Sequence, residues 1–144
     1  MFSSPVRQLM DRRKVLTCAP QTTVFDASKK MAAKSTGAVL IIHDEHLVGI
    51  FTERDAVYRV IAQGRDPTTT TLGDVMTASP KTIGPDRSFG AAMLLMHENG
   101  FRHLPVVENG KPVGLLSARN ALDPDLEEFA FEAQRRKQYS REAG

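Results

Sequence analysis

The sequence has few of the features that mark secreted or membrane-spanning proteins. It contains one cysteine and no tryptophan in 144 residues, and a single cysteine cannot form an internal disulfide, which favours a reducing compartment. Its strongest apolar run, Ala38–Ile42, is far shorter than the roughly 20 residues of a membrane-spanning helix, so no membrane partner is expected. The N-terminus lacks the charged and then apolar layout of a signal peptide. We therefore expect an intracellular, cytoplasmic protein.

An excess of charge of one sign is also missing. The 19 basic and 17 acidic side chains leave a formal net charge of +2, which does not by itself imply a polyanionic partner. Residues 123–144 hold six acids and four bases, so the remaining chain carries 15 bases and 11 acids. That modest local excess suits a small phosphate-bearing ligand better than a nucleic acid. The length and the hydrophobic share of 41% fit one compact folding unit.

The chain contains an internal repeat. Residues 16–56 align with residues 81–121 without a gap, and eight of the 41 aligned pairs are identical. Random pairing would give about two or three identities, so the pattern indicates a duplication. A weaker sequence similarity relates Val6–Asp11 to Leu72–Thr77. The predicted division is 1–64 for the N-terminal lead and first repeat, 65–71 for a connector, 72–122 for the second repeat and 123–144 for a C-terminal helix and tail.

Each half predicts the order β-α-β-β-α, and therefore a mixed α/β (α+β) fold. The expected elements of the first half are a strand at 15–18, a helix capped by Thr23, strands at 38–43 and 47–51, and a helix from 52 to about 63. In the second half, strands at 104–107 and 112–116 flank Asn109-Gly110, a strong hairpin signal. The helix residues expected to be buried are Val24, Ala27, Met31, Val57, Val60, Ile61, Phe89, Ala92, Met93 and Met96.

The last segment predicts an amphipathic helix that begins at Asp123-Pro124. Acidic side chains crowd its start and basic side chains its end, which is the order that the helix dipole favours. We expect this helix to dock on its own module or on a second copy of the chain.

The junction between strand and helix, present in both halves, carries the main candidate site. It is Gly-Ile-Phe-Thr-Glu-Arg-Asp at 49–55 and Gly-Leu-Leu-Ser-Ala-Arg-Asn at 114–120. A hydroxyl beside the free N–H groups at the start of a helix suits a phosphate. Asp55 can accept the two hydrogen bonds of a ribose diol, and Arg54 adds a donor fork for phosphate. Thr52 and Asp55 also match an N-terminal capping box, and both interpretations stay open because the two roles can coexist.

These residues resemble a known family, the tandem cystathionine-β-synthase-type (CBS) domain pair, also called a Bateman module. The resemblance runs from about Val6 to Leu122 and rests on motifs in a shared order: Val-Met leads, Thr-x-x-Pro entries, the Gly-x-x-Thr-x-x-Asp junction and Gly-Phe-Arg-His-Leu-Pro-Val-Val at 100–107. It implies two repeats packed sheet to sheet about a pseudo-twofold axis, with two clefts. Such clefts commonly bind AMP, ADP or ATP, and sometimes NAD or S-adenosylmethionine. It also implies a homodimer in which two pairs form a flat disc.

The resemblance assigns roles to residues of the first cleft. Asp55 would hold the ribose hydroxyls. The phosphate would face Thr52, Arg54, Arg102 and His103. The adenine would lie against Thr82, Ile83, Leu104 and Pro105. The matching positions of the second cleft are Thr17, Ser117, Arg119 and Asn120.

The second cleft departs from the family pattern at two points. Asn120 offers one acceptor oxygen and no charge, and Gly37-Ala38 stand where the other repeat has Arg102-His103. Losing both anchors would cost a few kcal/mol, since one charged hydrogen bond contributes about 1.5–3 kcal/mol. We therefore expect the Asp55 cleft to bind a nucleotide and the Asn120 cleft to be weak or empty.

Other candidate sites have simpler explanations. His43-Asp44-Glu45-His46 forms a predicted turn, whose adjacent side chains do not converge easily on one ion, so no metal site is assigned. Cys18 is interpreted as a buried structural thiol. The basic groups at 12–14 and 135–141 lack aromatic residues for stacking on nucleic acid.

The sequence shows no nucleophile, acid–base pair or metal cluster, so we do not expect an enzyme. The leading hypothesis is a non-catalytic module that senses adenine nucleotides and signals to an unidentified partner protein by a ligand-dependent rearrangement. The alternatives are a nucleic-acid-binding regulator, a structural dimeric adaptor and a slow nucleotide-hydrolysing enzyme.

Overall fold

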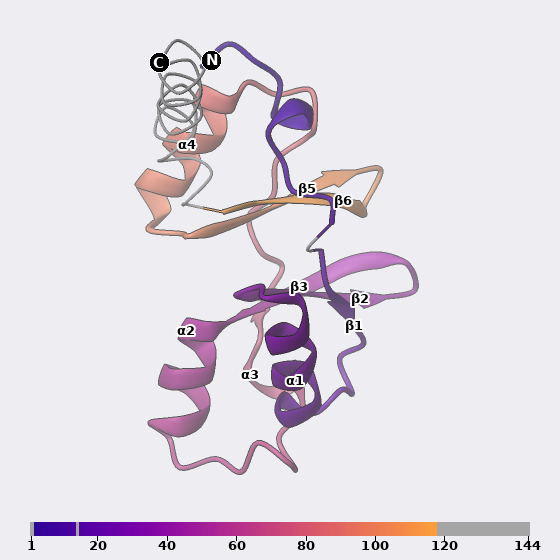
Figure 1. Ribbon diagram of the computed structural model, residues 1–144, viewed down its shortest axis with the longest axis vertical. Coiled ribbons are helices and arrows are strands. Elements are labelled where there is room, and N and C mark those ends of the chain that lie inside the picture. Colours follow the sequence, from indigo (N-terminus) through magenta and orange to yellow (C-terminus); the bar gives the residue numbers. More distant parts are fainter. Residues whose placement is uncertain (1, 14, 118–144) are drawn as a thin grey trace, which may run out of the picture.

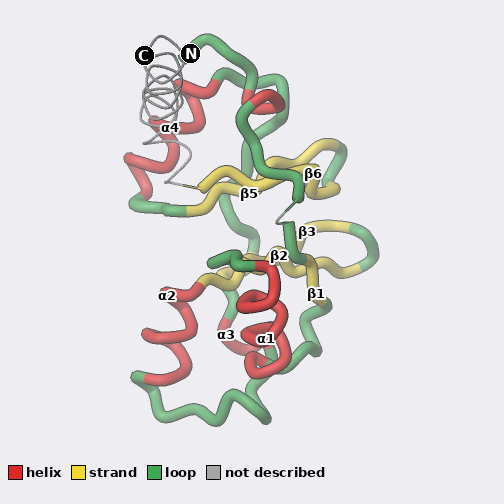
Figure 2. Tube along the Cα trace, viewed as in Figure 1, coloured by secondary structure: helices red, strands yellow, loops and turns green. Residues whose placement is uncertain are grey.

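The computed structural model describes residues 2–13 and 15–117. It has two stacked lobes whose strands face each other across the middle of the molecule (Figure 1). The helices lie on the outer sides of both lobes, with the strands between them (Figure 2). The predicted C-terminal helix at 123–144 lies outside the described residues.

The first repeat follows the predicted order β-α-β-β-α. In the second repeat the predicted opening strand is a single parallel bridge between Ile83 and Val106, and the predicted closing helix lies outside the described residues. The first lobe contains β1 (Thr17–Cys18), α1 (Val24–Lys34), β2 (Ala38–His43), β3 (His46–Thr52), and α2 (Glu53–Asp55) with its π-helical continuation η2 (Ala56–Ile61). The chain then forms α3 (Leu72–Val75) and β4 (Thr77–Ala78). The second lobe contains α4 (Phe89–Asn99), β5 (His103–Glu108) and β6 (Lys111–Ser117), together with the N-terminal 3-10 turn η1 (Val6–Gln8). The strand order of the larger sheet is β1-β2-β3-β4, and β5 pairs with β6.

Local signals place the two long helices as expected. The side chain of Thr23 accepts a hydrogen bond from the Asp26 N–H at 3.2 Å, and Ser88 does the same for Ala91 at 3.1 Å. These caps satisfy backbone donors that a helix start leaves free. The buried stripes are Val24, Ala27 and Met31 in α1, and Phe89, Ala92 and Met96 in α4, with Met93 half-buried.

The helix after β3 differs from the expectation. Val60 is buried, but Val57 and Ile61 are exposed. The helix η2 is π-helical, and the Ala62 N–H donates to the Val57 carbonyl, five residues earlier, at 2.8 Å. Val57 and Ile61 are four residues apart and share one face, and this face is turned away from the core that buries Val60.

The two hairpins repeat each other in register. Both antiparallel pairs, β2 with β3 and β5 with β6, carry an irregularity at the same place, between Ile41 and Ile42 and between Val106 and Val107. In the second hairpin Asn109 and Gly110 have φ values of 55° and 78°. This conformation is the one that a tight two-residue hairpin turn requires, which confirms the hairpin signal.

The N-terminal lead packs on the second repeat rather than the first. The N–H of Val6 donates to the Arg87 carbonyl at 2.8 Å. The backbone of Asp11 exchanges two hydrogen bonds with Leu115 in β6, at 2.8 and 3.0 Å. Val6 belongs to the hydrophobic core of the second lobe with Phe89.

The segment before the second repeat packs in turn on the first. The N–H of Leu72 donates to the Thr22 carbonyl at 2.8 Å, the counterpart of the bond from Val6. β4 pairs with β3, and Leu72 and Val75 join the core of the first lobe. Each lobe is therefore completed by the lead of the other repeat. The domain boundaries predicted from the sequence stay a prediction. The structure adds that the two lead segments are exchanged between the lobes.

Two glycines allow the lead segments, which contain Met10 and Met76, to pass close over strands β6 and β3. A Cβ on Gly49 would collide with the Sδ atom of Met76, and a Cβ on Gly114 would collide with that of Met10. Both glycines are buried in the strand before the junction. The glycine of the repeated Val-Gly pair thus leaves room for a methionine side chain in each lobe.

The two sheets pack face to face, as expected. Ala38, Leu40, Ile50 and Leu115 form a small buried cluster between the lobes. The N–H of Leu47 donates to the Gly110 carbonyl at 3.2 Å across the same boundary. This bond joins the start of β3 to the turn that follows β5, whereas the candidate site lies at the opposite end of β3, where Thr52 leads into α2.

Candidate functional site

The start of α2 forms a complete capping box. The Thr52 N–H donates to Oδ2 of Asp55 at 2.9 Å, and the Thr52 hydroxyl donates to the same oxygen at 3.2 Å. The Asp55 N–H donates to the Thr52 hydroxyl at 3.4 Å. The capping interpretation is confirmed, and the ribose-binding role of Asp55 stays a prediction.

Arg59 holds the second oxygen of Asp55 in place. Its Nε lies 3.5 Å from Oδ1, and the Asp55 side chain is 14% exposed. The same guanidinium donates to the carbonyls of Val75 and Met76, each at 3.2 Å. Arg59 therefore ties the candidate site to the crossing segment of α3. Arg59 follows Asp55 by four residues, a spacing that indicates an ion pair on one helix face. Our prediction from the sequence did not include this pair.

Arg54 projects from the first turn of α2 into solvent. Its guanidinium lies 5.1 Å from the ring centroid of Tyr58, a cation–π contact between residues four apart. Both side chains are exposed. This contact orients the predicted phosphate-binding cation without burying it.

The second repeat contributes the start of β5. His103 is half-buried, and its Nδ1 has no hydrogen-bond partner among the described atoms. Burial lowers the pKa of His103, the carboxylate of Glu53 opposes that change, and the charge of Arg102 adds to it. The carboxylate of Glu53, from the first repeat, therefore lies within electrostatic range of His103 in the second repeat.

The residues predicted to contact adenine divide into two groups. Ile83 and Leu104 belong to the hydrophobic core of the second lobe, and Pro105 is also fully buried. The Ile83 N–H donates to the Pro105 carbonyl at 3.1 Å. Thr82 is the exposed member of the set. The role of all four in adenine binding stays a prediction.

The second cleft is only partly described. Thr17 is exposed in β1, and Ser117 is half-buried at the end of β6, where it pairs with His103. Arg119 and Asn120 lie outside the described residues. The side chain of Glu53 lies directly against Gly37, a contact that the sequence did not predict.

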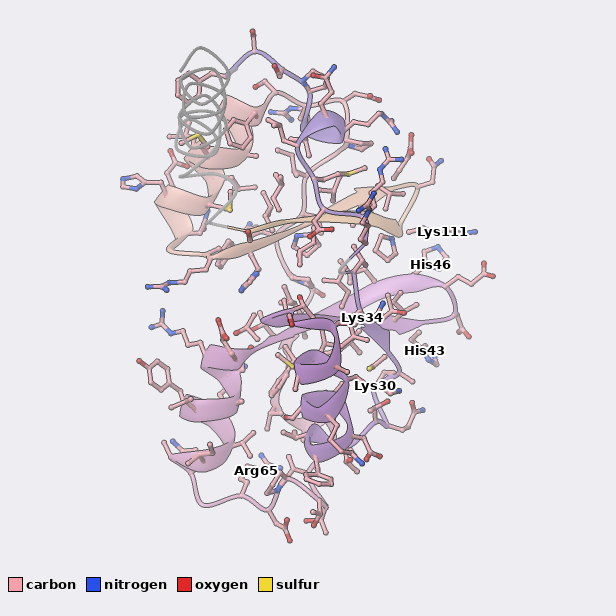
Figure 3. The ribbon with its side chains drawn as sticks, viewed as in Figure 1. Lys30, Lys34, His43, His46, Arg65 and Lys111 are labelled. Atoms are coloured by element: carbon pink, nitrogen blue, oxygen red, sulfur yellow. The ribbon has the colours of Figure 1, made fainter. Side chains whose placement is uncertain are left out.

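The other candidates behave as structural groups. His43 and His46 are exposed at the outer end of the β2–β3 hairpin (Figure 3), and Glu45 pairs with Lys111 at 3.2 Å. Within residues 2–13 and 15–117, no three histidine, cysteine or acidic side chains are grouped as metal ligands. Cys18 is buried, and burial raises the pKa of its thiol, as expected for an unreactive structural cysteine. None of the helices in the described part of the chain has the length and apolar character needed to cross a membrane.

Comparison with known proteins identifies the repeats. The CBS domain model matches residues 6–62 and 72–125. The chain is 35% identical over 129 residues to the mitochondrial CBS domain-containing protein CBSX3 of Arabidopsis thaliana. That alignment covers 86% of this chain and 63% of CBSX3. A second Arabidopsis relative is matched over 20% of its length, so the chain spans less than two thirds of these relatives.

Solved structures agree with the sequence matches. A CBS-domain protein of Burkholderia ambifaria superposes with a TM-score of 0.77 at 34% identity, covering 83% of this chain and 92% of that one. CBSX2, whose structure is a complex with AMP, superposes with a TM-score of 0.71 at 26% identity, covering 85% of this chain and 97% of that one. Because two CBS-domain matches fall on the two repeats and together span most of the sequence, this chain belongs to the CBS-domain family and folds as a CBS-domain pair.

Proposed function

We propose that this CBS-domain pair is a regulatory module that binds an adenine nucleotide, with AMP as the first candidate, in the cleft beside Asp55. The observation that carries the proposal is that Glu53 at the start of α2 lies within electrostatic range of His103 at the start of β5, because a ligand between them would touch both repeats. The complex of CBSX2 with AMP supports the choice of ligand. ADP and ATP share the same recognition chemistry. NAD and S-adenosylmethionine are left out, since no comparison supports them.

The side chains of the cleft suit the parts of a nucleotide. The N–H groups at the start of α2 and the exposed guanidinium groups of Arg54 and Arg102 would face the phosphate. Asp55 would accept hydrogen bonds from the ribose hydroxyls. The buried Nδ1 of His103, which has no hydrogen-bond partner among residues 2–13 and 15–117, would gain one from the ligand. Adenine would lie near Thr82, with Ile83, Leu104 and Pro105 forming the wall behind it.

Signalling would follow from contacts with both repeats. A nucleotide that bonds to α2 and to β5 stabilises the relative arrangement of the lobes in which both contacts are made. The cluster between the lobes is small, with four buried residues, so ligand contacts would form a large share of the interface. A partner protein would respond by binding that arrangement of the lobes more or less tightly than the nucleotide-free one. No catalytic group is part of this proposal.

The test compares two capping boxes of the same type. Asp55→Asn reproduces the residue that the second repeat has at position 120, and we expect AMP affinity to fall about 10- to 100-fold, as one charged hydrogen bond is lost. Asp74→Asn is the matched control, because Thr71 and Asp74 form a second capping box that is no part of the proposed cleft. Titration calorimetry measures both variants. Equal AMP affinity of Asp55→Asn and the unmodified protein would refute the proposal.

The exposed apolar residues of the helices favour a homodimer. Val57, Tyr58 and Ile61 on η2 are 49%, 56% and 71% exposed, and Leu94 on α4 is 57% exposed. Helices α2 and α4 lie on the same side of the two lobes (Figure 1). A second copy of the chain that covers this face would remove the apolar side chains from water.

A cytoplasmic location stays a prediction, since the relative CBSX3 is mitochondrial.

A further inference from the structure

The two oxygens of the Asp55 carboxylate have different neighbours. Oδ2 accepts hydrogen bonds from the Thr52 N–H at 2.9 Å and from the Thr52 hydroxyl at 3.2 Å, which uses both acceptor sites of a carboxylate oxygen. Oδ1 lies 3.5 Å from Nε of Arg59, farther than the roughly 2.7–3.2 Å of an N–H···O hydrogen bond. Oδ1 thus takes part in an ion pair and keeps its acceptor capacity for a ligand.

The guanidinium of Arg59 is fixed by a segment outside its own helix. Its Nη1 donates to the carbonyls of Val75 and Met76, each at 3.2 Å. These carbonyls lie at the end of α3, just before β4, which pairs with β3. Because β3 ends at Thr52, the contacts form a closed ring. Asp55 is held in this ring by Thr52 on one side and by an anchored arginine on the other.

This ring fixes a torsion that is otherwise soft. The last side-chain torsion of an aspartate has a broad energy minimum, so a free carboxylate turns easily. In Asp55 the bonds from Thr52 fix Oδ2, and the ion pair with Arg59 fixes the direction of Oδ1. The Asp55 side chain is 14% exposed, so a ligand can reach it. An acceptor that is in place before the ligand arrives binds more tightly than one that must be ordered on binding.

We propose that Arg59 is the positioning residue that makes this cleft selective for ribose over a deoxygenated sugar. The inference rests on the proposed function of the Asp55 cleft. Arg59 holds the carboxylate so that Oδ1 accepts hydrogen bonds from the 2′- and 3′-hydroxyls of the nucleotide. Since Arg59 is itself held by the end of α3, ribose recognition also depends on the segment that crosses from the second repeat. Without Arg59 the carboxylate turns more freely, and the contribution of the hydroxyls to binding falls.

The experiment titrates AMP and 2′,3′-dideoxy-AMP into the full chain in a calorimeter. The unmodified protein should bind AMP about 10-fold or more tightly, because the dideoxy sugar makes no hydrogen bonds to the charged carboxylate. Arg59→Gln should bind the two ligands within about threefold of each other, through weaker AMP binding. The ratio of the two affinities does not depend on the fraction of a sample that is folded, so a merely structural role of Arg59 would leave it unchanged.

The chain offers a matched control for this variant. Arg65 lies 3.8 Å from Oδ2 of Asp74, which forms the other capping box with Thr71. Arg65→Gln therefore removes an arginine that faces a capping aspartate outside the proposed cleft. This variant should keep the preference of the unmodified protein for AMP, and an equal loss of preference would overturn the inference.

Two further variants separate positioning from other roles. In Asp55→Asn combined with Arg59→Gln, AMP affinity should equal that of Asp55→Asn alone within about twofold, because Arg59 acts through the carboxylate. Additive losses would show that Arg59 acts on AMP binding by another route, and the positioning role would be wrong. Arg59→Lys keeps the charge without the planar fork, so its preference for AMP should fall about threefold or more. Arg59→Lys replaces Arg59→Gln in the test if the latter does not fold.

The outcomes distinguish this inference from the proposed function. If the unmodified protein binds no AMP, or binds AMP and 2′,3′-dideoxy-AMP equally, the proposed function with its ribose contact at Asp55 fails. If the unmodified protein prefers AMP and Arg59→Gln keeps that preference, the positioning role of Arg59 is wrong and the proposed function stands.

Discussion

At the scale of single residues, His103 combines burial with an unsatisfied ring nitrogen. Burial lowers its pKa, and the neighbouring charges of Glu53 and Arg102 act in opposite directions. A histidine whose pKa is lowered in the folded state makes its stabilising contribution when it is neutral. That contribution is complete above the unfolded pKa of about 6.5 and is lost as the pH falls through the folded pKa.

The predicted consequence is a pH-dependent stability that His103→Gln reduces. Between pH 7.5 and 5 the melting temperature of the unmodified protein should fall, since the unfolded state takes up a proton that folded His103 resists. Gln cannot take up that proton, so the variant should show a shallower slope. Thermal unfolding followed by circular dichroism at several pH values measures it. His43→Gln, at an exposed turn, should keep the slope of the unmodified protein. Parallel slopes for His103→Gln and the unmodified protein would contradict this explanation.

At the scale of elements, the crossing leads depend on glycine in the strands beneath them. A Cβ at Gly114 would meet Cγ of Met10 at 2.8 Å and Cβ at 3.1 Å, as well as the sulfur. The Cβ of Met10 is held by the backbone of the lead, so the methionine cannot simply rotate away. The equivalent contact at Gly49 involves the outer atoms of Met76.

We therefore expect Gly114→Ala to destabilise the protein by about 1–3 kcal/mol, the usual range for overpacking a core. Gly49→Ala should cost less, because the atoms it meets lie further along a flexible side chain. Urea unfolding measures both. Gly84→Ala is the control, since a Cβ there meets Arg87 at an ordinary 3.8 Å. Combining Gly114→Ala with Met10→Ala should recover part of the overpacking cost, and a fully additive loss would speak against the contact.

The sequence indicated the helices and strands well, because their signals are local. The cap of Thr23 and the bends at Asn109-Gly110 involve residues that are close in sequence. The ends of the four hairpin strands agree with the prediction within one residue, whereas β1 begins two residues later than predicted and the short strand β4 was not predicted. The exposure of Val57 and Ile61 could not be predicted in the same way. Helical spacing groups residues four apart on one face, but packing against the rest of the lobe decides which face of the helix is buried.

At the scale of the whole molecule, the exposed face of η2 and α4 predicts association. Among the residues that the structure describes, Ile61 is the most exposed large apolar residue, at 71%. Ile61→Lys would bring a charge into a dimer interface on this face, and we expect the variant to be monomeric. Size-exclusion chromatography with light scattering measures the mass. Phe25→Lys, on the exposed side of α1 at 45%, should remain dimeric. A monomeric unmodified protein would exclude this homodimer.

The candidate site shows both what sequence reveals and what it does not. The capping box of Thr52 and Asp55 and the pairing of Asp55 with Arg59 span three and four residues, so neighbouring positions in the chain indicate them. The electrostatic effect of Glu53 on His103 links different repeats, and no local pattern indicates it. Ile83 and Leu104 were predicted to face adenine, and their side chains lie in the core of the second lobe.

The sequence by itself determined the duplication, the order of elements and the residue types at the strand-to-helix junctions, because each depends on residues near one another in the chain. Only the tertiary structure decided that the leads are exchanged between the lobes, that methionines cross Gly49 and Gly114, and that the side chain of Glu53 lies against Gly37. Those arrangements depend on how two repeats pack together. Packing chooses between partners that are far apart in the chain, and no local pattern records that choice.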